Sequence, residues 1–266
     1  MVTSRPLQRL FVSALLGLLA VGAHAQNILY ITDGDSSKLQ AIDTTNGTIL
    51  FSATTSFYAY PIAVRDTVRL GYRVNSGLTG EYDSTTGARI GPLLSPSGTN
   101  WDEALDGTAS LAKNYSFAWP GSSTTPVFET APDWSNATQI FTIPQTSITG
   151  ITFDTTHSTL WFSDFSSVYQ YSLTGTLLSQ FTHTAGYNGL AYQASTDTLW
   201  LVPNSGSSPL RQYSLTGALL QSLTTPTRSG NVYGAEFAAI PEPSTWALLG
   251  LGAAGLGVAA RRRRLN

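Results

Sequence analysis

The chain has 266 residues, a length that suits one large all-β domain with short tails. Charged residues make up only 11% and hydrophobic residues 42%, so a sizeable core is available and disorder throughout the chain is excluded. The absence of cysteine excludes disulfides and cysteine-ligated metal sites. Residues 26–240 hold eight basic and 15 acidic residues, and this net charge of −7 argues against nucleic acid as a partner.

Residues 1–25 have the three-part layout of a secretory signal peptide. Arg5 and Arg9 form a basic head, residues 10–21 are an apolar run, and Ala23 and Ala25 flank His24 in a small-x-small cleavage site. The run is too short to span a bilayer comfortably, and a buried helix would need neither the basic head nor the alanine pair. We therefore expect export through the secretion translocon and removal of residues 1–25.

Residues 26–239 show alternating apolar and polar residues split by turn residues, which predicts strands and no helix. Two successive units read alike over residues 148–178 and 187–220, each with a Leu-Trp strand and a later Tyr-Ser-Leu-Thr-Gly turn. The Leu-Trp strands are offset by 39 residues and the turns by 42, and the three extra residues fall in the loop 204–209. A period of about 40 residues with four short strands is typical of a β-propeller blade.

Fainter copies of this unit occupy the first half of the domain. Strands are expected at 29–33, 39–43, 59–64, 68–74, 78–83 and 89–94, whereas a blade between 101 and 143 is expected from spacing alone. The first strand of each blade is expected near Ile62, Ala104, Ile151, Leu190 and Ala235.

The two ends of the domain are incomplete blades. The domain begins with a second strand at Ile28 and ends with a lone first strand over 232–239, and pairing of these two would close a ring without exposed edges. The predicted fold is therefore an all-β propeller of about five four-stranded blades. Four or six blades remain open because the stretch 101–143 is irregular.

Residues 240–266 form a third segment. Pro241, Glu242 and Pro243 precede 15 apolar residues at 246–260, and Arg261, Arg262, Arg263 and Arg264 follow. At 1.5 Å per residue the apolar run covers about 22 Å, so it would insert with local thinning of the bilayer. Trp246 suits one interface and the arginines suit the cytoplasmic face, which predicts a transmembrane helix in the inner membrane.

These three parts, in this order and at this end, resemble the PEP-CTERM sorting signal of Gram-negative bacteria. The resemblance implies that an exosortase-type enzyme processes the chain near Pro241-Glu242-Pro243 and that the product reaches the cell surface or the extracellular space. It also associates the chain with bacteria that make exopolysaccharide. An ordinary tail anchor is the alternative, and neither interpretation says what the exported domain does.

Residues 29–33 and 42–47 resemble repeats of the NHL, SMP-30 or quinoprotein-like propellers. In metal-dependent sugar lactonases with this architecture, acidic residues converge on the central channel. Glu103 and Glu236 lie near first strands and form a candidate channel pair, although a matching set of ligands is not evident. Solvated or turn-capping acids are the simpler interpretation.

No catalytic set is evident elsewhere. His157 and His183 fall in a turn and at a strand end, where histidines are usually solvated, and no Gly-x-Ser-x-Gly nucleophile motif occurs. The alternating oxygens of residues 33–37 suit Ca²⁺ but lack the bidentate glutamate of an EF-hand, so a hairpin turn is favoured. We therefore predict no catalytic residue, no metal and no cofactor.

Tryptophans supply the candidate ligand contacts. Trp161 and Trp200 recur at equal places in two units, which favours packing within blades. Trp119 and Trp134 flank irregular loops and are the candidates for ligand contact.

The sequence thus predicts a non-enzymatic surface or matrix protein. Its propeller would be an interaction platform, with exopolysaccharide as the suggested ligand. The alternative is a lactonase-like or lyase-like enzyme with a metal in the central channel. A third option is a propeller that only spaces or assembles surface proteins.

Overall fold

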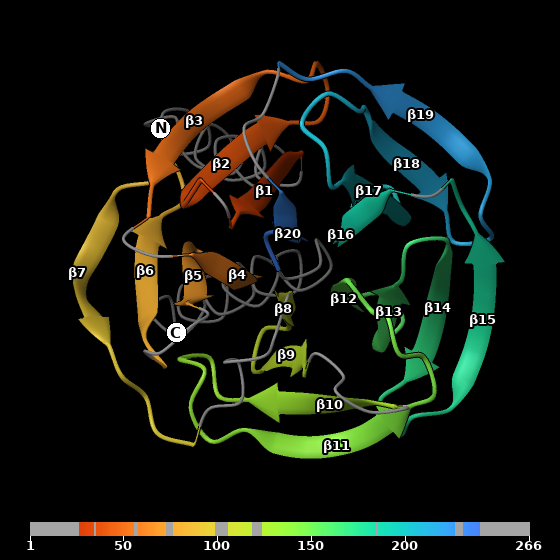
Figure 1. Cartoon of the computed structure of the whole chain (residues 1–266), viewed down its shortest axis with the longest axis horizontal. Coiled ribbons are helices and arrows are strands. Elements are labelled where there is room, and N and C mark those ends of the chain that lie inside the picture. The colour runs from red at the N-terminus through yellow and green to blue at the C-terminus, as the bar shows by residue number, and fades with distance from the viewer. Residues whose placement is uncertain are drawn as a thin grey trace, which may run out of the picture.

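The structure is a computed structural model that describes residues 27–34, 36–55, 58–72, 77–98, 106–118, 124–184, 186–226 and 231–239. Within these residues, 20 strands form five antiparallel sheets of four strands around one axis (Figure 1). The prediction of five four-stranded blades is confirmed.

Each blade contributes one strand to the centre and one to the rim (Figure 1). From centre to rim, the first blade holds β20 (Val232–Phe237), β1 (Ile28–Asp33), β2 (Lys38–Asp43) and β3 (Ile49–Thr54). The second holds β4 (Ala59–Val64), β5 (Thr67–Tyr72), β6 (Thr79–Asp83) and β7 (Arg89–Leu94). The third holds β8 (Gly107–Ala109), β9 (Asn114–Phe117), β10 (Thr125–Thr130) and β11 (Thr138–Ile143). The fourth holds β12 (Gly150–Asp154), β13 (Thr159–Ser163), β14 (Ser167–Ser172) and β15 (Leu177–Thr182). The fifth holds β16 (Tyr187–Gln193), β17 (Thr198–Pro203), β18 (Leu210–Ser214) and β19 (Leu219–Leu223).

Burial falls from the centre to the rim, and the sequence pattern follows it. Every residue of β4, β12 and β16 is buried, because neighbouring blades cover both faces of an inner strand. The rim strands β3 and β15 alternate between exposed and half-buried residues for most of their length, since only one face packs against a neighbour.

The repeated Thr-Gly turns lie where the sequence predicts them. Gly175 and Gly217 have φ values of 82° and 87°, and their amides donate to the carbonyls of Ser172 and Ser214 at 3.0 Å. Glycine adopts this left-handed conformation without a steric penalty, so the turn links the third strand of each blade to the rim strand.

The ring closes as predicted, by antiparallel pairing of β1 with β20. The hydroxyl of Thr32 on β1 accepts the amide hydrogen of Gly234 at 2.9 Å and donates to the carbonyl of Tyr60 on β4 at 3.1 Å. A Cβ atom at Gly234 would clash with that carbonyl oxygen. Glycine therefore lets the closing strand approach the second blade closely.

Two sequence expectations fall partly or wholly outside the described residues. The inner strand of the third blade is the three-residue β8, which begins at Gly107; Ala104 lies outside the described residues. No helix among the described residues could cross a membrane. The predicted transmembrane helix at 246–260 and the signal peptide both lie outside the described residues, and the structure gives the helix no support.

Both ends of the described chain emerge on one face of the disc. Asn27 Oδ1 accepts a hydrogen bond from Gln193 at the end of β16, and the Ala239 amide donates to the carbonyl of Val64 at the end of β4. We call this side the terminal face. The opposite side, where the inner strands begin, is the entry face.

Candidate functional site

The centre of the ring is occupied by a buried carboxylate, Asp106, which is 0% exposed. Its two oxygens accept the amide hydrogens of Gly107 at 2.7 Å and Ile151 at 3.1 Å. The amides of Leu190 and Ala235 also hydrogen-bond to it. One side chain thus ties together the inner strands β8, β12, β16 and β20.

Glu236 on β20 is the second buried carboxyl at the axis. Among the described residues its Oε2 atom has no hydrogen-bond partner. Burial raises the pKa of Glu236 well above its ordinary value, and the nearby Asp106 raises it further. Burial also raises the pKa of Asp106, against the effect of its four amide donors. Because those donors favour an ionised Asp106, we assign the proton of this pair to Glu236.

The axis does not fit the metal that the enzyme alternative requires. The amides around Asp106 direct the positive ends of their dipoles at the carboxylate oxygens that a cation would need. Glu103, the other candidate channel acid, lies outside the described residues. We therefore derive no metal chemistry at the centre, and the pair is better explained as a tie between blades.

The protonation of Glu236 predicts a pH dependence of folding. Its raised pKa means that the folded chain holds this proton more tightly than the unfolded chain, so stability falls as the pH rises above 4.5 towards the folded pKa. One such group contributes at most about 1.4 kcal/mol per pH unit. Glu236→Gln should flatten the decline measured by urea unfolding between about pH 5 and pH 8. An unchanged slope in the variant would contradict the assignment.

The terminal face carries a cluster of Asp154, His157 and Asp197, whose potential ligand atoms lie within 4.8 Å of one another. Buried Asp154 accepts from His157 Nδ1 at 2.9 Å and from Trp161 Nε1 at 3.3 Å. Its hydrogen bond with His157 raises the pKa of that histidine. Tyr192 donates to Asp197 at 2.7 Å. These bonds and the approach of His157 to Asp197 join the hairpin turns of blades four and five.

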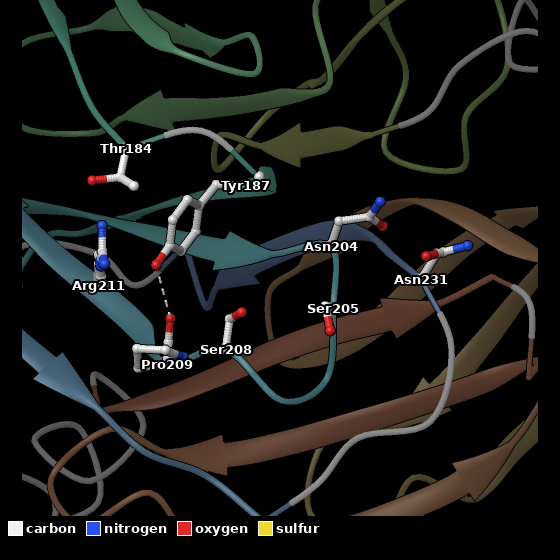
Figure 2. Close-up of a pocket in the computed structure, with 9 residues that line it drawn as sticks. Thr184, Tyr187, Asn204, Ser205, Ser208, Pro209, Arg211 and Asn231 are labelled. Atoms are coloured by element: carbon white, nitrogen blue, oxygen red, sulfur yellow. Dashed lines mark hydrogen bonds between the residues drawn. The ribbon is translucent and has the colours of Figure 1, made fainter.

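The entry face has a hollow of about 410 Å³ between the fifth and first blades (Figure 2). We call it the entry-face hollow. Its lining is mostly hydroxyl and amide side chains, from the start of β16, the β17–β18 loop and the approach to β20. The lining residues are Thr184, Gly186, Tyr187, Asn204, Ser205, Ser208, Pro209, Arg211 and Asn231.

Tyr187 and Arg211 form the ordered side of this hollow (Figure 2). The guanidinium carbon of Arg211 lies 5.2 Å from the centre of the Tyr187 ring, within the range of a cation–π contact. The Tyr187 hydroxyl donates to the carbonyl of Pro209 at 3.2 Å, and the His183 ring meets Tyr187 edge to face. The ring is therefore held from several sides and positions the guanidinium.

Two residues that line the hollow each carry one unsatisfied buried polar atom. Arg211 Nε and Asn204 Oδ1 are buried atoms without a hydrogen-bond partner among the described residues. Unpaired buried donors and acceptors are uncommon in folded proteins, and an ordered water or a small rearrangement of the side chains can complete their bonding.

The predicted ligand-contact residues lie elsewhere. Trp119 is outside the described residues, and Trp134 is 0% exposed and packs with Ala63, Ala109 and Ala239. This burial leaves Trp134 no free ring face and favours a packing role. Trp161 and Trp200 are buried within their blades, as predicted. The sequence analysis did not single out Arg211. The available signal was rarity, because the domain has only eight basic residues.

The C-terminal segment matches a known protein-sorting motif. The family described as PEP-CTERM protein-sorting motif matches residues 239–264. The chain carries a PEP-CTERM sorting motif. The motif marks an exported protein that an exosortase-type enzyme processes, as the sequence predicts. Pro241, Glu242 and Pro243 lie within the matched segment.

Two solved structures are similar to this chain at low sequence identity. A chain from the crystal structure of a nidogen–laminin complex is 11% identical with a TM-score of 0.52, and the match covers 80% of this chain and 99% of that one. A functionally unknown protein from Desulfotomaculum acetoxidans DSM 771 is 12% identical with a TM-score of 0.47, covering 77% and 98%. No curated protein matches the sequence. The likeness to NHL, SMP-30 or quinoprotein-like propellers stays a prediction.

Proposed function

We propose that residues 26–239 form a non-enzymatic interaction platform that binds exopolysaccharide in the entry-face hollow. The observation that carries this proposal is the lining of the hollow, which offers hydroxyl and amide groups around a held tyrosine and arginine. Such groups can donate to and accept from sugar hydroxyls. The PEP-CTERM motif supports the proposal, since it marks the protein for export.

The position of the chain ends also supports a platform. Ala239 lies at the terminal face, and the sorting motif continues from it. In the proposed arrangement, the signal peptide is removed and the segment 246–260 holds the chain at the inner membrane until processing. The entry face then points away from the attachment point, so an extended polymer can reach it.

A substitution that fills the hollow tests this function. Ser205→Trp adds a large ring at an exposed lining residue, and we expect at least a tenfold loss of exopolysaccharide retention by the full-length chain in mild detergent. The matched control is Ser195→Trp in an exposed turn of the terminal face. Affinity electrophoresis against neutral and acidic bacterial polysaccharides measures the effect. Failure of the wild-type chain to bind any of them would refute the proposal.

A further inference from the structure

Arg211 is the one charged residue among the described residues that line the entry-face hollow. No aspartate or glutamate of the described chain forms an ion pair with it, and no described residue forms a hydrogen bond with its side chain. Its guanidinium contacts the Tyr187 ring. No described residue therefore neutralises the guanidinium, and its N–H groups can donate to an anionic ligand.

The surroundings of Arg211 keep its guanidinium in place. The residue lies within β18, where it pairs with Leu201 of β17 and with Ser222 of β19. Its backbone is thus fixed between two strands, and its head group rests on a tyrosine that is anchored to Pro209. A planar guanidinium held against an aromatic ring loses less freedom on binding than a mobile side chain would.

We propose that the entry-face hollow selects a sugar unit that bears a carboxylate, a uronic acid residue, and that Arg211 binds this carboxylate. A guanidinium has only donors, in a fork that matches the two oxygens of a carboxylate, whereas a neutral sugar hydroxyl satisfies it poorly. This inference rests on the proposed polysaccharide-binding function.

The remaining lining groups match the rest of such a sugar unit. Asn204 and Ser208 also line the hollow, and amide and hydroxyl groups of this kind can donate to and accept from ring hydroxyls. Asn231 and Ser205 add further polar groups on the opposite side of the hollow from Arg211 (Figure 2). Carboxylate and hydroxyl recognition are thus separated within one hollow.

The overall charge of the domain makes the selection local. With a net charge of −7 between residues 26 and 240, the domain as a whole repels a polyanion. Binding of an acidic polysaccharide would therefore depend on this specific arginine and not on a general basic surface. Removing the charge of Arg211 should therefore lower the affinity for the acidic sugar. Removing the charge of another basic residue should not.

Short oligogalacturonates and their methyl esters test the proposal, because the two probes share a backbone and differ in the carboxylate. By titration calorimetry with the full-length chain in mild detergent, we expect the free acid to bind at least tenfold more tightly than the ester. Arg211→Gln should abolish this preference, so that the variant binds the acid and the ester with similar affinity. Arg89→Gln, which removes a charge from exposed Arg89 on the rim strand β7, should keep the preference.

The outcomes separate this inference from the proposed function. Equal binding of acid and ester by the wild type, or a preference that survives Arg211→Gln, overturns the role of Arg211 while saccharide binding stands. Absence of binding for both probes overturns the uronate proposal, and the polysaccharide panel above then decides the broader function. If Arg211→Gln shifts the thermal unfolding curve, Arg211→Lys replaces it, and a weakened but remaining preference supports the proposal. If Arg211→Lys keeps the full preference for the acid, the claim that the guanidinium fork binds both carboxylate oxygens is overturned.

Discussion

Replacing Asp106 by alanine is expected to destabilise the propeller by about 3–5 kcal/mol, the largest effect we anticipate from a polar substitution in this chain. The substitution leaves four buried amide groups, on four different inner strands, without their acceptor. It also removes the negative charge beside Glu236, which offsets a small part of the loss. Urea unfolding monitored by tryptophan fluorescence measures the change in the free energy of unfolding.

Two further variants give this prediction its control. Asp66→Ala removes an exposed aspartate from the β4–β5 turn and should change stability by less than about 0.5 kcal/mol. Asp106→Asn keeps one acceptor oxygen but places an amide donor against backbone donors. Its loss of unfolding free energy should therefore lie between those of Asp66→Ala and Asp106→Ala. Equal stability of Asp106→Ala and the wild type would show that the central amides find other acceptors.

The repeat made the architecture predictable from sequence. Leu160-Trp161 and Leu199-Trp200 recur at a fixed offset, and the strands that contain them became β13 and β17 of neighbouring blades. The lone strand at 232–239 predicted ring closure for a physical reason, because an unpaired inner strand would leave open edges. Local pattern and repeat spacing therefore sufficed for the ring and its closure, whereas the irregular stretch 101–143 left four or six blades open beside the predicted five.

The centre and the hollow were not predictable in the same way, because they join residues from different blades. Asp106 precedes the shortest inner strand and belongs to no repeated motif, yet it bonds to amides at 151, 190 and 235. Tyr187 and Arg211 are separated by a strand and a loop, and only the return of β18 beside β17 brings the ring and the guanidinium together. Trp134 shows the opposite error, since a loop position in sequence became a core position in space.

The second large effect is expected for the repeated tryptophans. Trp161→Ala and Trp200→Ala should each cost about 3–5 kcal/mol, because both indoles are buried and their removal leaves a large cavity. Each indole also donates a hydrogen bond at the same structural place, Trp161 to Asp154 at 3.3 Å and Trp200 to Gln193 at 2.8 Å. The acceptor differs in chemistry between the blades, whereas the donor and its position do not.

Phenylalanine substitutions separate packing from this hydrogen bond. Trp161→Phe and Trp200→Phe keep most of the ring and remove the N–H group, so each should lose about 1–3 kcal/mol. The matched control is Leu220→Ala, which truncates an exposed apolar residue on the rim strand β19 and should change stability by less than about 0.5 kcal/mol. Urea unfolding of the five variants in parallel measures these differences. If Trp161→Ala and Trp200→Ala lost no more stability than Leu220→Ala, the indoles would not stabilise the blades by packing. The repeated turns would then be the part of the repeat that stabilises the fold.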